Sequence, residues 1–96
     1  MSNKGALAVT NLLDSVKGIS KLITNKKVID ENEHGYGGLQ FDLKSKGKSF
    51  RHKIFLNFND LYDLTIRGKT NTNILVGELT QLLTWVVELD NNLEEE

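Results

Sequence analysis

The residues best suited to binding chemistry gather in the middle of the chain, in the stretch 44–53. Five of these ten positions are basic: Lys44, Lys46, Lys48, Arg51 and Lys53. Phe55 continues the alternation of Arg51 and Lys53, so an extended chain puts these three side chains on one face. Cations that hold phosphates beside a ring on which a base stacks are typical of a nucleic-acid contact. The competing interpretation is a lysine-rich hairpin tip that discourages edge-to-edge aggregation.

Residues for catalysis or metal binding are sparse. The chain has no cysteine and two histidines, His34 and His52. His34 lies among Asp30, Glu31 and Glu33, but carboxylates without regular spacing make a weak divalent-ion site, and a solvated acidic loop is favoured. For His52, a hydrogen-bonded and partly buried side chain is favoured over a proton-transfer role. We therefore expect no catalytic residues, no metal and no cofactor.

The segment 73–93 is predicted to be a helix that is apolar over an unusually wide arc. Its hydrophobic residues recur at steps of three and four, the spacing of one helical stripe: Leu75, Leu79, Leu82, Val86, Leu89 and Leu93. With the apolar residues that flank this stripe, the arc spans roughly 220°, against about 100° for an ordinary surface helix. Such a helix needs cover on two sides. It is either the central core helix of the domain or, in addition, the seam of a homodimer.

Four residues of this helix are the predicted protein interface: Trp85, Leu83, Val87 and Val76. Trp85 carries the prediction, because Glu78 and Glu88 flank it along the helix. A tryptophan rimmed by polar groups is typical of an interface anchor if it is exposed. The alternative is that Trp85 closes the core. The charged residues also argue against a membrane span, since they would lie in lipid.

A β-hairpin is predicted from residues 39–44 and 49–58, with its turn at Lys46 and Gly47. The predicted register pairs Leu43 with Phe50, Phe41 with His52, Leu39 with Ile54, Asp42 with Arg51, and Lys44 with Ser49. The first three pairs share one face and the last two share the other. That separation is what a half-buried sheet requires, and it adds one cross-strand ion pair.

The N-terminal part is predicted to begin with a helix over residues 6–25. Its apolar residues have the spacing of a one-faced helix, and Lys26 and Lys27 suit its C-terminal turn. Val28 and Ile29 then start a short strand. Residues 30–38 are predicted to be a mobile loop.

Residues 60–67 are ambiguous between a short helix, which is favoured, and a strand. Asp60 suits a helix cap and Gly68 a helix end, whereas Tyr62, Leu64 and Ile66 alternate with polar residues as in a strand. Residues 69–72 are predicted to be a polar linker into the last helix.

The predicted fold class is α+β: an N-terminal helix, a central β-hairpin with room for a third strand, a short helix and a long apolar C-terminal helix. Residues 1–96 form one small domain, with 94–96 as a frayed acidic tail. Charge is uneven along the chain, with ten Lys or Arg against five Asp or Glu in residues 1–53 and two against eight in residues 54–96. This asymmetry either orients a partner or is incidental surface chemistry.

We therefore expect a small non-enzymatic binding or regulatory protein that docks on a partner protein, as a homodimer. The alternative is a nucleic-acid-binding module that uses the basic hairpin, although the net charge of −1 weakens this alternative. The N-terminus lacks a secretory signal, which predicts a cytoplasmic protein. The abundance of asparagine and lysine hints at a phage or low-GC bacterial source.

Overall fold

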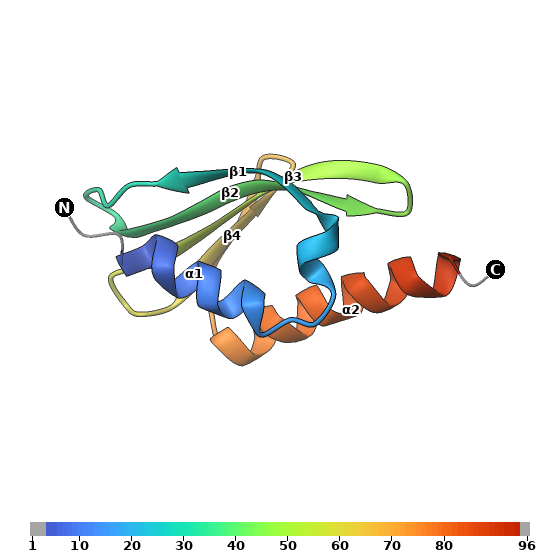
Figure 1. Cartoon of the computed structure of the whole chain (residues 1–96). Helices are drawn as coiled ribbons and strands as arrows, with labels where there is room; N and C mark the ends of the chain where they lie inside the picture. Colours follow the sequence, from blue (N-terminus) through green and yellow to red (C-terminus); the bar gives the residue numbers. More distant parts are fainter. Residues whose placement is uncertain (1–3, 95–96) are drawn as a thin grey trace.

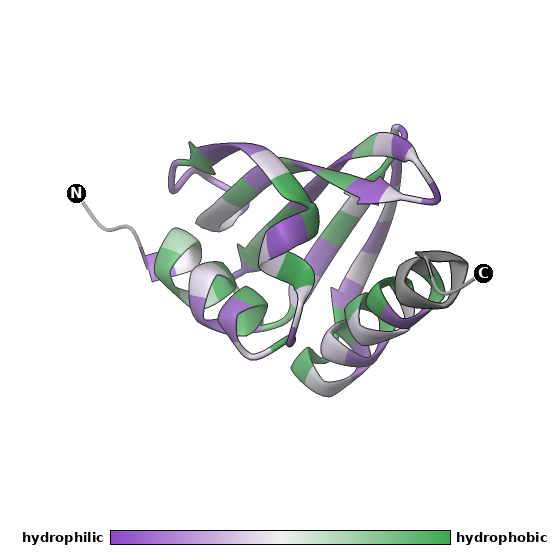
Figure 2. Ribbon diagram, turned by 45° about the vertical axis from the view of Figure 1, so that its right-hand side comes forward, coloured by the Kyte–Doolittle hydropathy of each residue, from purple (hydrophilic) through white to green (hydrophobic). Residues whose placement is uncertain are grey.

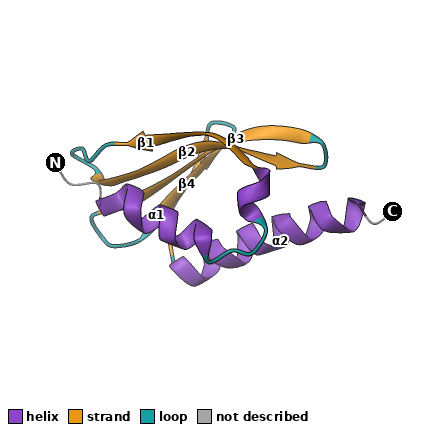
Figure 3. Ribbon diagram, viewed as in Figure 1, coloured by secondary structure: helices purple, strands orange, loops and turns teal. Residues whose placement is uncertain are grey.

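Alternating side chains make the middle of the chain a broad sheet rather than an isolated hairpin. The computed structural model describes the backbone of residues 4–94 and the side chains of residues 4–89. Its elements are α1 (Lys4–Asp14), a 3-10 turn η1 (Ile19–Leu22), β1 (Ile23–Ile29), β2 (Gly35–Ser45), β3 (Lys48–Asn57), β4 (Tyr62–Ile66), β5 (Lys69–Ile74) and α2 (Val76–Glu94) (Figures 1 and 3).

The five strands form one antiparallel sheet in the order β1-β2-β3-β4-β5, so each strand pairs with its neighbour in the chain. Both helices lie on the same face of this sheet (Figure 2). We call the face that the helices cover the inner face and the opposite one the outer face. The predicted architecture, built on one hairpin and a central apolar helix, is therefore wrong: a helix is followed by a complete sheet and then by a second helix.

The predicted register of the β2–β3 hairpin is confirmed at every pair. Leu43 lies opposite Phe50, Phe41 opposite His52, Leu39 opposite Ile54, Asp42 opposite Arg51, and Lys44 opposite Ser49. Lys46 and Gly47 form the turn and both have positive φ. The register could be predicted because a slip of one residue would move the whole apolar set to the other face.

The favoured short helix over residues 60–67 is wrong, and β4 occupies this stretch. The buried amide of Asn57 explains why: its Oδ1 accepts hydrogen bonds from the backbone N–H groups of Asn59 (2.9 Å) and Leu61 (3.2 Å). Its Nδ2 donates to Asp63 (2.9 Å). This amide shapes the β3–β4 turn so that Tyr62 enters the sheet with its side chain buried. Asp60, expected to cap a helix, has a left-handed φ of 59°.

The segment predicted to be a linker belongs to the sheet, and so does the end of the predicted loop, whereas residues 30–34 do connect β1 to β2 outside the strands. Residues 69–72 lie in β5, which is an edge strand. Its side chains there are polar and exposed, so the sequence lacks the alternation of apolar and polar residues that would indicate a strand. Residues 35–38 begin β2, where missing side chains allow close backbone approach. A Cβ on Gly38 would collide with the Ile54 carbonyl of the neighbouring strand.

The N-terminal helix is shorter than predicted. α1 ends at Asp14, where the Ser15 hydroxyl donates to the Leu12 carbonyl at 2.6 Å. Gly18 has φ +88°, a left-handed conformation that no helix continues through. Lys26 and Lys27, predicted to end this helix, instead lie in β1.

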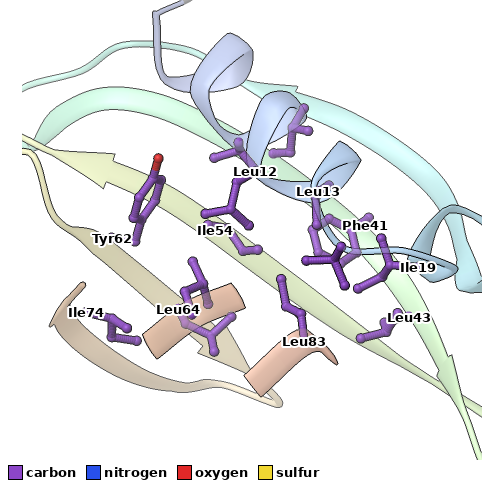
Figure 4. Close-up of a cluster of buried hydrophobic side chains, with 14 of the residues drawn as sticks. Leu12, Leu13, Ile19, Phe41, Leu43, Ile54, Tyr62, Leu64, Ile74 and Leu83 are labelled. Carbon is purple, nitrogen blue, oxygen red and sulfur yellow. The ribbon is translucent and has the colours of Figure 1, made fainter. Parts of the chain in front are cut away.

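The C-terminal helix is peripheral rather than the long apolar centre of the fold. α2 buries one line of side chains at steps of four, Leu79, Leu83 and Val87, against the inner face. The sheet and α1 supply most of the core, which also includes Leu12, Leu13, Ile19, Phe41, Leu43, Ile54 and Leu64 (Figure 4). The prediction of a broadly apolar helix at the centre of the fold is therefore wrong, and α2 leaves Leu82 and Trp85 exposed.

The first turn of α1 lies directly on the backbone of β2. A Cβ on Gly5 would collide with the Gly37 carbonyl and would also meet the Tyr36 carbonyl oxygen. Gly77 is the second residue of α2, as Gly5 is of α1, but a Cβ there would meet nothing within 4 Å. These two glycines therefore occupy equivalent helix positions, but Gly5 is packed against backbone and Gly77 faces open space.

We predict that Gly5→Ala and Gly77→Ala change stability in opposite directions. Gly5→Ala should lower the free energy of unfolding by about 1–3 kcal/mol, because the methyl group must push α1 away from β2. Gly77→Ala should raise it by about 0.5–1 kcal/mol through helix propensity alone. Urea unfolding followed by circular dichroism measures both, and a Gly5→Ala variant as stable as wild type would contradict the close packing.

Candidate functional site

One candidate surface is the strip of apolar side chains that α2 leaves uncovered. Leu75, Leu82 and Trp85 are 55%, 46% and 59% exposed. Leu82, Trp85 and the half-buried Leu89 follow the steps of three and four that bring residues to one side of a helix, and Leu75 is the residue just before α2. We call Leu75, Leu82 and Trp85 the α2 strip. It borders a shallow depression of about 710 Å³ that Glu78 and Glu88 also line.

The structure does not bring the four predicted interface residues together. Leu83 and Val87 are only 2% and 6% exposed and belong to the core of this chain. Val76 and Trp85 are exposed, but Trp85 lies on the side of α2 turned away from Leu83 and Val87. The sequence missed Leu82 and Leu75 as surface residues, because an apolar arc alone does not say which half of it faces the core.

A second candidate surface is the outer face of the sheet, which neither helix covers. One row of paired residues crosses all five strands there: Lys27, Gln40, Lys53, Thr65 and Thr70. Arg51 and Phe55 lie on either side of Lys53 along β3, on the same face as the sequence predicted. Lys44 also has the register of this face, whereas Lys46 and Lys48 lie at the hairpin tip.

The β1 lysines were not predicted to join this surface. Lys26 and Lys27 line one shallow depression together with Asp42 and Arg51. The missed signal is compositional, because four of the seven β1 residues are β-branched: Ile23, Thr24, Val28 and Ile29. A prediction of a strand over residues 23–29, after Gly18, would have placed these two lysines beside the basic hairpin.

On the outer face, Arg51 has an acidic partner, whereas three lysines have none within the described part of the chain. Asp42 accepts a hydrogen bond from Asn25 Nδ2 at 2.9 Å and lies 3.7 Å from Arg51 Nε. Among the described residues, Lys26, Lys27 and Lys53 form no ion pair. The face therefore carries three cations without an ion pair to any described residue, two in β1 and one in β3, on either side of β2.

Phe55 gives this basic face an aromatic ring beside Lys53, at one end of the group of cations. The ring is half-buried and packs over Gly35, where its Cε1 occupies the space that a Cβ would take. Its neighbours across the sheet are Gly38 and Asp63. A shallow depression of about 550 Å³ lies beside the ring, lined also by Ile29, His34, Gln40 and Lys53.

The two histidines differ in their surroundings. His34 is exposed, with Nε2 3.4 Å from Glu33 Oε1. Within the part of the chain that the structure describes, no three His, Cys, Asp or Glu side chains gather as metal ligands would. His52 is buried on the inner face, stacked on Phe41 with a centroid distance of 5.8 Å.

Burial lowers the pKa of His52 below its usual 6.5, against smaller opposing effects of the Phe50 carbonyl and the Asp42 charge. The His52 Nδ1 and the Phe50 carbonyl oxygen are 2.9 Å apart, so the neutral ring with a proton on Nδ1 satisfies that carbonyl. His52 is thus held in place by stacking and one hydrogen bond, inside the fold and away from both candidate surfaces.

We predict that His52 makes the protein less stable in mild acid. Because its pKa is lower in the folded chain than in the unfolded chain, unfolding takes up a proton, and stability falls as the pH drops through 6.5 towards the folded-state pKa. His52→Phe keeps a ring on Phe41 and should reduce this loss between about pH 7.5 and pH 5.5. Urea unfolding at both pH values measures it, with His34→Gln as the matched control. An equal loss in wild type and His52→Phe would contradict the assignment.

Among residues 4–94, no helix combines the length and the hydropathy needed to cross a membrane. Comparison of the whole chain with protein families, curated proteins and solved structures finds no match. The two candidate surfaces therefore rest on the geometry and charge of this chain alone.

Proposed function

We propose that this chain is a non-enzymatic binding protein that docks on a second protein through the α2 strip. The observation that supports this most is the 59% exposure of Trp85 beside the exposed Leu82. The inward side of α2 is already satisfied by Leu79, Leu83 and Val87, so the strip adds nothing to the core of the domain. Large apolar side chains at helical spacing are the anchors by which a helix binds a groove.

The charge of α2 suggests the chemistry of the partner. Glu78 and Glu88 flank the strip, and the sequence contains no Lys or Arg after Lys69. A complementary partner presents an apolar groove for Leu82 and Trp85 with basic side chains along its edge. Such complementarity contributes to specificity and to the association rate. A cytoplasmic location remains part of this proposal.

A homodimer through the same strip is the alternative occupant. An antiparallel pair centred between Leu82 and Trp85 would bury both side chains, but it would bring Glu78 of one copy near Glu88 of the other. Like charges in such a seam oppose pairing. Light scattering separates the two cases, because a homodimer would have about twice the 10.8 kDa mass of the chain.

We predict that Trp85→Ala and Leu82→Ala each weaken partner binding by about tenfold or more, because anchors at the centre of an interface carry most of its energy. The matched control is Leu7→Ala, which removes an equally apolar and 63% exposed side chain from α1. The partner would be captured from the native host on immobilised protein, purified, and titrated by calorimetry against each variant.

The capture alone does not decide the question. The proposal requires that a purified partner bind wild type and Leu7→Ala equally and the two α2 variants more weakly. A partner that binds all four proteins with the same affinity would contradict docking through the α2 strip. A doubled mass that is lost in Trp85→Ala would instead make a second copy the occupant.

A further inference from the structure

The outer face of the sheet has a composition that packing alone does not explain. It lies opposite the helices, so its side chains contribute nothing to the core (Figures 1 and 2). Lys26, Lys27 and Lys53 gather on it from β1 and β3, with Arg51 beside them. Lys27 and Lys53 lie in one row on either side of Gln40, so their like charges repel each other across β2. A polyanion that binds there would relieve this repulsion.

The same face carries an aromatic ring and an amide, groups of the kind that contact nucleic-acid bases. Phe55 lies two residues from Lys53 on β3, roughly 7 Å along the strand. A shallow depression lies beside the Phe55 ring, and Gln40 lines it as well. A base stacked on Phe55 would have its phosphate within reach of Lys53 and Lys27, and Gln40 could hydrogen-bond to its edge. Aromatic rings and cations combined in this way are the common features of single-strand binding surfaces.

The geometry points to single-stranded nucleic acid bound across the outer face, with Phe55 as the stacking platform and Lys26, Lys27, Arg51 and Lys53 on the backbone phosphates. This site goes beyond docking through α2 and lies on the opposite side of the sheet. A single strand fits better than a duplex, because the depressions on this face are shallow and its ring can stack only on an unpaired base. The site differs from the basic hairpin of the sequence, since β1 supplies half of its cations.

The acidic residues of α2 lower the net charge but lie away from the outer face, whereas Glu33 lies beside His34 at the depression next to Phe55. The net charge of −1 arises because residues 70–96 contain acids and no cation. The acids Glu78 and Glu88 belong to α2, on the inner side of the sheet. Asp42 and Asp63 lie on the outer face, but Asp42 is bonded to Asn25 and near Arg51, and Asp63 accepts hydrogen bonds from Asn57 and the Asn73 backbone.

The test uses a fluorescein-labelled oligothymidylate of about fifteen nucleotides and fluorescence anisotropy at low salt and at about 0.2 M salt. The double variant Lys27→Glu/Lys53→Glu should bind about tenfold more weakly or worse, with a shallower salt dependence. The matched control, Lys17→Glu/Lys21→Glu, makes the same charge change at exposed lysines on the helical side and should bind like wild type.

The stacking part of the proposal has its own variant. Phe55→Leu keeps an apolar side chain over Gly35 but cannot stack on a base, so it should weaken binding by about fivefold or more, whereas Phe55→Tyr should not. If Phe55→Leu proves unstable by circular dichroism, the lysine variants still decide, because their side chains are exposed.

Three results would overturn the proposal. The first is no binding of wild type to oligothymidylate or to an oligouridylate of equal length at low salt. The second is equal weakening by the two double charge variants, which would mean a general attraction to the whole protein. The third is equally tight binding of a duplex of the same length with no effect of Phe55→Leu.

Discussion

The burial of one face of a five-stranded meander is the constraint on which the rest of this structure depends. Every strand pairs with its neighbour in sequence, so a single alternation of side chains, continued through Leu43, Ile54 and Leu64, defines which face is apolar. Both helices are needed on that face, because a sheet this wide cannot leave its apolar side in water. Gly5 lets α1 approach the backbone of β2 closely enough to cover one end of it, and the line of Leu79, Leu83 and Val87 covers the other. The outer face is then free of any structural task.

The two candidate surfaces follow from this one-sided arrangement. α2 contacts the core along one line of side chains, and Leu75, Leu82 and Trp85, the α2 strip, lie outside that line. The sheet turns its other face, with the β1 and β3 cations, away from both helices. The uneven charge of the sequence therefore places acidic and basic residues on opposite sides of the sheet. Glu78 and Glu88 lie beside the α2 strip, and Lys27 and Lys53 lie on the outer face. A partner bound to the α2 strip would therefore leave the outer face accessible, and a ligand bound to the outer face would leave the α2 strip accessible.

The sequence predicted those parts of the fold in which several local signals agree. In the β2–β3 hairpin, alternation, the turn at Gly47 and the Asp42–Arg51 pair all require the same register, so Arg51, Lys53 and Phe55 were correctly placed on one face. β5 could not be predicted, because an edge strand with exposed polar side chains has no alternation to detect. Residues 60–67 were misassigned because the turn depends on the buried Asn57 amide, a contact invisible in local propensity. The C-terminal helix was wrongly predicted to be the apolar centre of the fold, because no local pattern says whether Leu83 or Trp85 faces the sheet.

The absence of cysteine allows the central claim, that both helices cover one face only, to be tested by maleimide labelling of single-cysteine variants. The informative pairs are Leu64→Cys with Thr65→Cys in β4, and Leu83→Cys with Trp85→Cys in α2. The account predicts rapid labelling at 65 and 85 under native conditions, and protection at 64 and 83 that is lost in denaturant. Labelling of Leu83→Cys as fast as Trp85→Cys would mean that α2 is not docked on the sheet. Protection at position 65 as strong as at 64 would mean that the outer face is covered, and either result would contradict the account.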